Sequence, residues 1–302
     1  MHPVLAVLSR HKIREGEEML FSSDIRRPAV AGAFYPDSPS TLRRMVREFM
    51  DKAPRVDVDG RIIGLISPHA GYVYSGHVAG HAYKQVKGES YDSVVVMGPS
   101  HRMPFWGFAL WAKGGFETPL GTVLIDEGLA SELMSLNDGI KHLPQAHAYE
   151  HSIEVQLPFL QESLGEFKLV PILMQDYSEA ACHSLASTLG ECLKDRNVLI
   201  VASTDLSHYP EYDEAVRADR IVIEAVSKFD PAELRRRMDE HMRLGVPELH
   251  TMMCGAGPVY VLLEAAKLLG AEKVKVLKYA NSGDVPFGDK GQVVGYMAAA
   301  IW

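Results

Sequence analysis

The chain has 302 residues and a formal charge of −8, with 47% hydrophobic and 23% charged residues, an ordinary balance for a globular protein. It has no long basic run, so we expect no nucleic-acid partner. No apolar stretch is long enough to span a membrane. The first ten residues contain an apolar piece of only five residues with no small-residue cleavage site after it, so we expect no secretory signal there. The cysteines Cys182, Cys192 and Cys254 are sparse and odd in number, which argues against a disulfide framework and favours a cytoplasmic location.

In chain order, residues 1–25 are charged and weakly periodic, and we expect a peripheral segment there. Residues 26–302 alternate between apolar runs and segments of helical spacing. The pattern predicts strands at 61–67, 92–98, 105–112, 167–174, 197–203, 273–280 and 292–300. It predicts helices at 39–52, 76–87, 126–136, 150–163, 178–194, 211–228, 231–242 and 257–269. The expected fold class is α/β, a single domain with a mixed, mostly parallel central sheet flanked by helices.

Three of the apolar runs end in a short polar loop that carries a histidine: His69, His101 and His208. Loops that leave the carboxyl ends of parallel strands lie along one edge of a sheet, where ligands bind. The three histidines are therefore predicted to share one cleft. The alternative for His69 is a loop histidine that bonds only to backbone.

Two carboxylate-bearing segments accompany these loops. Asp205 precedes His208 by three residues and could hold its ring or act beside it as acid or base; alternatively, it caps a following helix. Glu150, His151 and Glu154 fall at a predicted helix start, where the two carboxylates would share one face. His151 could orient a ligand or donate to a substrate, or it could simply cap the helix.

Cys254 precedes a helix that begins among glycines, a position that favours thiolate. Cys182 and Cys192 fall within a helical pattern and are predicted to be buried and inert. One thiolate and two histidines suit copper, iron or zinc and suit magnesium or calcium poorly.

These segments together resemble the Memo family, the protein-B component of a prokaryotic system with radical-SAM and companion proteins. The resemblance covers residues 27–302 and is carried by SPHAGYVYSG, YDSVVVMGPSH, ETPLG, EHSIEVQLPFL, VASTDLSHY, MCGAGP and KYANSGD. The family is similar in fold to class III extradiol dioxygenases of the LigB type, which hold non-haem iron.

The resemblance implies metal ligands at His69, His101 and Cys254. It implies that His208 corresponds to the dioxygenase catalytic base, with Asp205 beside it; we add His151 as a third candidate catalytic residue. The dioxygenases use a carboxylate where this chain has Cys254, so ring cleavage does not follow from the likeness.

Three functions remain open from the sequence. The first is a metal-dependent redox protein with copper or iron, acting on an unidentified small molecule. The second is a scaffold that binds a peptide or a phosphorylated ligand in the same cleft. The third is a hydrolase with zinc-bound water. The family resemblance also implies radical-SAM and companion proteins as partners.

Overall fold

The structure is a computed structural model that describes residues 24–302; residues 1–23 lie outside the described part of the chain. That part contains a sheet of eight strands in the order β10-β11-β2-β9-β3-β8-β4-β7 and a sheet of three in the order β1-β5-β6. The strands are β1 (Ile25–Arg26), β2 (Gly64–Ser67), β3 (Ser93–Pro99), β4 (Phe108–Leu110), β5 (Gly115–Thr118), β6 (Gly121–Leu124), β7 (Ile140–His142), β8 (Lys168–Met174), β9 (Val198–Ser203), β10 (Val274–Asn281) and β11 (Gly295–Ile301).

The four central strands β2, β9, β3 and β8 run parallel to one another. On the two sides, β11 and β4 pair antiparallel with this block, so the sheet is mixed. All residues of β2, β3 and β9 are buried, which is typical of strands covered by helices on both faces. The predicted α/β class with a mixed sheet is confirmed.

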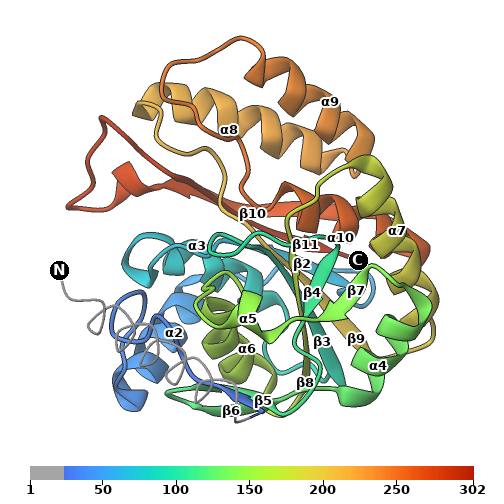
Figure 1. The fold of residues 1–302 in the computed structure, drawn as a ribbon. Helices are drawn as coiled ribbons and strands as arrows, with labels where there is room; N and C mark the ends of the chain where they lie inside the picture. Colours follow the sequence, from blue (N-terminus) through green and yellow to red (C-terminus); the bar gives the residue numbers. More distant parts are fainter. Residues whose placement is uncertain (1–23) are drawn as a thin grey trace, which may run out of the picture.

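Helices cover both faces of the larger sheet (Figure 1). On one face α3 packs against β2 and β11, with α2 and α6 outside it; on the other, α10 packs against β9 and β3 beside α7. The helices are α2 (Pro39–Lys52), α3 (Tyr72–Gln85), α4 (Glu127–Leu136), α5 (Pro144–His147), α6 (Leu157–Leu164), α7 (Glu179–Cys192), α8 (Tyr212–Ser227), α9 (Pro231–Met242) and α10 (Ala256–Leu268), with 3-10 turns η1 (Glu154–Gln156) and η2 (Ser282–Asp284).

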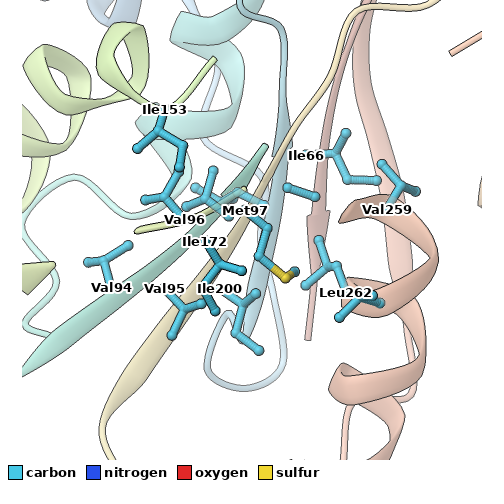
Figure 2. Packing of buried hydrophobic residues seen from close by; sticks show 14 of the residues in the cluster. Ile66, Val94, Val95, Val96, Met97, Ile153, Ile172, Ile200, Val259 and Leu262 are labelled. Carbon is cyan, nitrogen blue, oxygen red and sulfur yellow. The ribbon is translucent and has the colours of Figure 1, made fainter. Parts of the chain in front are cut away.

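The core forms where side chains of the central strands meet the two helical layers. Figure 2 shows Val96 of β3 beside Ile153, while the next residue, Met97, points toward Leu262 of α10. Alternation along a strand sends neighbouring side chains to opposite faces of the sheet. One short apolar strand thus anchors both layers and fixes the level at which its following loop begins.

The small sheet was not predicted. Ile25 and Arg26 pair with Gly115 and Phe116 of β5, so the folded part already includes the end of the segment expected to be peripheral. A strand of two residues has no periodicity that a sequence pattern can reveal. The rest of that segment, residues 1–23, lies outside the described residues.

The helix predicted at 150–163 is wrong in its first half. Glu150 and His151 lie in an irregular connection after α5, and helix resumes only through η1 and α6. Pro158 lies in the first turn of α6, where its missing N–H costs nothing. Glu150 and Glu154 consequently do not share a helix face. The helix predicted at 76–87 begins four residues earlier, at Tyr72 after Gly71.

Candidate metal centre

Three neighbouring parallel strands place candidate site residues at one edge of the sheet. His69, Asp205 and His101 each follow the last residue of a strand by two positions, after β2, β9 and β3 respectively. These strands are adjacent in the sheet, and the register pairs Ser67 with Ser203. The three loops, which carry His69, His101 and, beyond Asp205, His208, therefore begin at the same level, as the predicted shared edge requires.

Three histidines form a compact group at this edge. The ligand-capable nitrogens of His69, His101 and His151 all lie within 4.8 Å of one another. The rings of His101 and His151 stack with centroids 4.8 Å apart, and His69 meets both edge-on. The side chain of His69 is buried, whereas that of His101 is 31% exposed. The group is thus reached from solvent on the His101 side.

Cys254 joins this group through His69. Its Sγ lies 3.2 Å from His69 Nε2 and accepts the Asp205 backbone N–H at 3.4 Å. Cys254 stands just before α10, whose first turn packs so tightly on β9 that a side chain at Gly255 would collide with the Ser203 carbonyl. Glycine at that position therefore lets the cysteine come close to the histidines.

Glu150 fixes the orientation of His101. One oxygen of its carboxylate accepts the His101 backbone N–H at 2.5 Å, and the other lies 3.0 Å from His101 Nδ1. A carboxylate only accepts, so Nδ1 carries the proton and Nε2 keeps a free lone pair. Burial alone would raise the pKa of Glu150, but the hydrogen bond from His101 and the charges of His101 and His151 hold it at about 2. The group is therefore a carboxylate at neutral pH.

His151 was expected to assist catalysis rather than to stand among the ligand-capable nitrogens. Its Nδ1 is buried and makes no hydrogen bond, although Glu150 Oε1 lies 3.3 Å away in poor alignment. Burial, the largest cause, lowers the pKa of His151 to about 4, and repulsion from His101 adds to the effect. Its ring is neutral at pH 7 and can act as a ligand.

Asp205 and His208 lie close to the histidine group. Asp205 Oδ1 accepts the backbone N–H of His69 at 2.8 Å, and its Oδ2 lies 3.9 Å from His69 Nε2. No helix follows it directly, so the capping alternative is wrong. Burial raises the pKa of Asp205 to about 7 against the opposing hydrogen bond from His69. His208 donates Nδ1–H to the Leu206 carbonyl at 2.9 Å, and burial lowers its pKa, with repulsion from His101 contributing.

The expectation of a Cys254 thiolate is wrong for the metal-free protein. Burial raises the pKa of this thiol well above its usual value, and the nearby charge of Asp205 raises it further. These effects outweigh the helix N-terminus, so the thiol keeps its proton at neutral pH, and a metal that bound there would have to displace it. Cys182 and Cys192 are buried within α7, as predicted.

A buried ion pair that the sequence did not reveal supports the loop of Glu150 and His151. Arg26 bonds Glu154 Oε2 at 2.7 Å and donates to the backbone carbonyls of His147 and Glu150. Glu154 also accepts two backbone N–H groups and the Tyr35 hydroxyl. Arg26 and Glu154 are 128 positions apart, so no local signal could have paired them.

Two of the hollows on the surface of the described residues lie elsewhere. One of about 710 Å³ includes Ser93 and Lys168, where β3 and β8 begin. Another, of about 420 Å³, includes Val198, where β9 begins. Both lie at the amino ends of the parallel strands, opposite the histidine group. Ligands of such sheets bind at the carboxyl ends, so the chemistry rather than the size of a hollow identifies the candidate site.

Comparisons with known proteins agree with this architecture. A family model described as Memo-like protein matches residues 26–300. A MEMO1 family protein of Methanothermobacter thermautotrophicus is 40% identical over 90% of this chain and 98% of its own. One of Sulfolobus acidocaldarius is 37% identical over 91% of this chain and 98% of its own.

A solved structure, an uncharacterized protein from Escherichia coli K12, is similar with a TM-score of 0.52 and 15% identity. It covers 79% of this chain and 99% of its own, and it supports the fold alone. Within residues 24–302 there is no helix with the length and apolarity that a bilayer crossing requires. The family match over nearly the whole described chain, together with close relatives of matching length, places this protein in the Memo family.

Proposed function

We propose that the protein binds one copper or iron ion between His69, His101 and Cys254, with His151 as a further donor, and uses it in an oxidation of a small molecule. The observation that carries this is the convergence of three histidine nitrogens within 4.8 Å, with a thiol 3.2 Å from one of them. Unprotonated imidazole nitrogens in such a group repel one another unless a proton or a cation lies between them.

The donor set fits these metals. Imidazole and thiolate are ligands for copper, iron and zinc, whereas magnesium and calcium require oxygen. The buried Nδ1 of His151 lacks a hydrogen bond, and an unpaired buried polar atom is costly unless a ligand satisfies it. Glu150 behind His101 matches the carboxylate–histidine arrangement that orients metal ligands.

A bound copper or iron ion would supply one-electron chemistry at this edge. The chain's own residues would hold and move protons around it. Asp205, with a pKa of about 7, can exchange a proton near neutral pH. His208 keeps Nε2 free and its ring neutral, so it can accept one. The exposed side of His101 provides access for a substrate.

Hydrolysis with zinc is the second candidate, because three histidines also form a ligand set for catalytic zinc. The scaffold function is the third reading and needs no stoichiometric metal. A cytoplasmic location is part of the proposal and is supported by three cysteines that form no disulfide. Association with radical-SAM and companion proteins is likewise a proposal from the family.

The test is metal analysis of protein purified anaerobically without added metal, followed by titration of the stripped protein with Cu(I), Fe(II) and Zn(II). His101→Ala and Cys254→Ser should each lower affinity for the native metal at least tenfold. His183→Ala, at an exposed histidine bonded to Glu264, and Cys192→Ala are the matched controls. Both should bind as the wild type does.

Each metal outcome selects one function. Stoichiometric copper or iron that Cys254→Ser weakens supports the redox proposal. Tight zinc alone, together with hydrolysis of ester or phosphoester probes, would replace it with the hydrolase. Absence of any metal bound more tightly than micromolar would leave the scaffold reading.

A further inference from the structure

We infer that Ser203 fixes His69 as the tautomer protonated at Nδ1, through a buried hydrogen-bond chain whose direction is forced at both ends. Ser203 is thereby a positioning residue for the proposed metal centre. The effect of Ser203 on metal affinity rests on the proposed function, whereas the tautomer of His69 can be tested in the protein without metal. The chain joins four side chains, three from α3, η1 and β9 and one from the loop after β2: Tyr83, Gln156, Ser203 and His69.

The orientation of Gln156 is the first forced step. One end of its amide lies 2.9 Å from the backbone carbonyl of Pro68. A carbonyl oxygen only accepts, so that end must be the NH₂ group. The same nitrogen lies 2.8 Å from Ser203 Oγ and donates to it. The amide oxygen then faces Tyr83, whose hydroxyl donates to it at 2.7 Å.

The single hydroxyl proton of Ser203 is the second forced step. Ser203 Oγ lies 2.6 Å from the backbone carbonyl of Ser152, which again only accepts, so the proton points there. With its proton used, the oxygen can only accept from His69 Nδ1, 2.9 Å away. The Nδ1 atom must therefore carry a hydrogen.

The opposite arrangement would leave two acceptors facing each other. If Nδ1 were unprotonated, Ser203 would have to turn its proton toward His69, and its oxygen would face the Ser152 carbonyl at 2.6 Å with no hydrogen between them. Ser203 and Gln156 are fully buried and His69 is 2% exposed, so water cannot relieve this contact. An unsatisfied buried acceptor disfavours that state by roughly tenfold or more.

The consequence lies at the other ring nitrogen. His69 Nε2 keeps its lone pair and directs it to the side of Cys254 Sγ, 3.2 Å away. Free imidazole in water prefers its proton on Nε2, the nitrogen that a metal would need here. The chain thus reverses an intrinsic preference before any metal arrives. Because Ser203 is neutral, it does so without adding charge, unlike Glu150 behind His101.

The experiment reads the tautomer directly in the metal-free protein. Long-range proton–nitrogen correlation spectra of protein with labelled histidine should show His69 protonated at Nδ1, with its signal assigned from the His69→Gln variant. Ser203→Ala should shift His69 largely to the Nε2-protonated form. Ser203→Thr, which keeps the hydroxyl, should restore the original tautomer.

Ser67→Ala is the matched control. Ser67 pairs in register with Ser203 on the neighbouring strand and is equally buried, but its hydroxyl makes no hydrogen bond to Gln156 or His69 and lies beside Tyr83, at the far end of the chain. Its removal should leave the His69 signals unchanged. A wild-type His69 protonated at Nε2 would overturn the inference outright, without any variant that has to fold.

Metal titration separates this inference from the proposed function. Ser203→Ala should weaken metal affinity by about 10- to 100-fold, as loss of a ligand's supporting partner does. Ser67→Ala removes no partner of a ligand and should weaken it by less than about twofold. Equal affinities for Ser203→Ala and wild type would overturn the positioning role. A wild-type protein that binds no metal would instead overturn the proposed function. The proton–nitrogen spectrum of His69 would still decide whether the tautomer is as inferred.

Discussion

At the scale of single residues, the two histidines at the sheet edge are supported differently. His69 rests on a neutral hydroxyl, and His101 rests on the buried carboxylate of Glu150. Both partners leave Nε2 unprotonated, but only Glu150 adds a negative charge beneath the site. That charge favours a cation and makes His101 the stronger electron donor of the two.

Glu150→Gln tests how much depends on that charge. The carboxylate accepts the backbone N–H groups of His101, His151 and Ser152 as well as His101 Nδ1. The amide of glutamine would turn a donor toward at least one of these donors. We expect the free energy of unfolding to fall by about 2–4 kcal/mol, measured by urea denaturation of the metal-free protein.

Glu166→Gln, on the exposed turn after α6, is the control for that loss and should change stability by less than about 0.5 kcal/mol. Native stability in Glu150→Gln would mean that the Glu150 carboxylate does not accept these four hydrogen bonds.

The sequence predicted much of the site at this scale, and where it failed the reason is distance along the chain. His69, His101 and Asp205 each come two residues after an apolar strand, so their place at one edge of the sheet could be predicted from the carboxyl ends of those strands. His151 follows no strand, and its place depends on Arg26, more than a hundred positions away. Burial also raises the pKa of Cys254, and burial depends on the whole fold. The local sequence pattern reveals only the helix start that follows this cysteine.

At the scale of elements, α3 begins directly after the loop of His69, and it must lie close to α2. The approach depends on glycine: a Cβ at Gly80 would lie 2.7 Å from the backbone of Phe49. The helix at 76–87 was predicted from its spacing, but this contact was not. Glycine has a low helix propensity, so its presence in a helix ordinarily suggests lower stability rather than a close contact.

Gly80→Ala should therefore destabilise the protein although alanine is the better helix former. The gain of about 1 kcal/mol in helix propensity is exceeded by the cost of pushing α2 outward, typically 1–3 kcal/mol. We expect a net loss of about 1–2 kcal/mol in thermal or chemical unfolding. In Gly128→Ala the same change falls in α4, where the new Cβ lies no closer than 3.6 Å to any group; it should stabilise by up to about 1 kcal/mol. A stabilised Gly80→Ala variant would show that the helices are not in contact there.

Strands were predicted best where they are longest and most apolar. β3, β8 and β9 are runs of six or seven buried residues, and each was expected within a residue of its position. The strand β4 was expected within the longer run 105–112, whereas the short strands β1, β5, β6 and β7 were not predicted and owe their pairing to the main fold. Their sequences carry too few residues for a period of two to be seen.

At the scale of the whole molecule, the parallel block separates two edges with different chemistry. Titratable groups buried at and near the carboxyl edge include four histidines that burial keeps neutral: His69, His147, His151 and His208. An unfolded chain would protonate all four near pH 6.5. Folding is therefore linked to proton release below that pH.

Two buried carboxyls act in the opposite direction. Burial raises the pKa of Asp205 to about 7 and that of Asp219 to about 6. Each binds a proton more readily in the folded than in the unfolded chain, so its stabilising effect is present below pH 4 and is lost as pH rises through 6 to 7. Between pH 4 and 6.5 these carboxyls offset part of the loss caused by the histidines.

His147 offers the cleanest test of this linkage, because it lies behind the site rather than in it. Its Nε2–H donates to the Ala109 carbonyl at 3.0 Å, and burial lowers its pKa to about 3. As pH falls from 6.5 toward 3, the unfolded chain gains a proton that the folded chain refuses. This single residue should remove about 1.4 kcal/mol of stability per pH unit. Glutamine can keep the hydrogen bond to Ala109 and has no proton to gain, so His147→Gln should be less stable than wild type at pH 7 and approach it as pH falls.

Denaturation of metal-free protein in steps between pH 7 and pH 4 measures this difference. Asp219→Asn serves as the control of opposite sign: it removes a carboxyl whose protonation favours folding, so its deficit relative to wild type should grow as pH falls from 6 to 4. If His147→Gln and wild type lose stability in parallel over the whole range, His147 accepts its proton in the folded state. The acid sensitivity of the protein would then have to come from the histidines of the candidate metal centre.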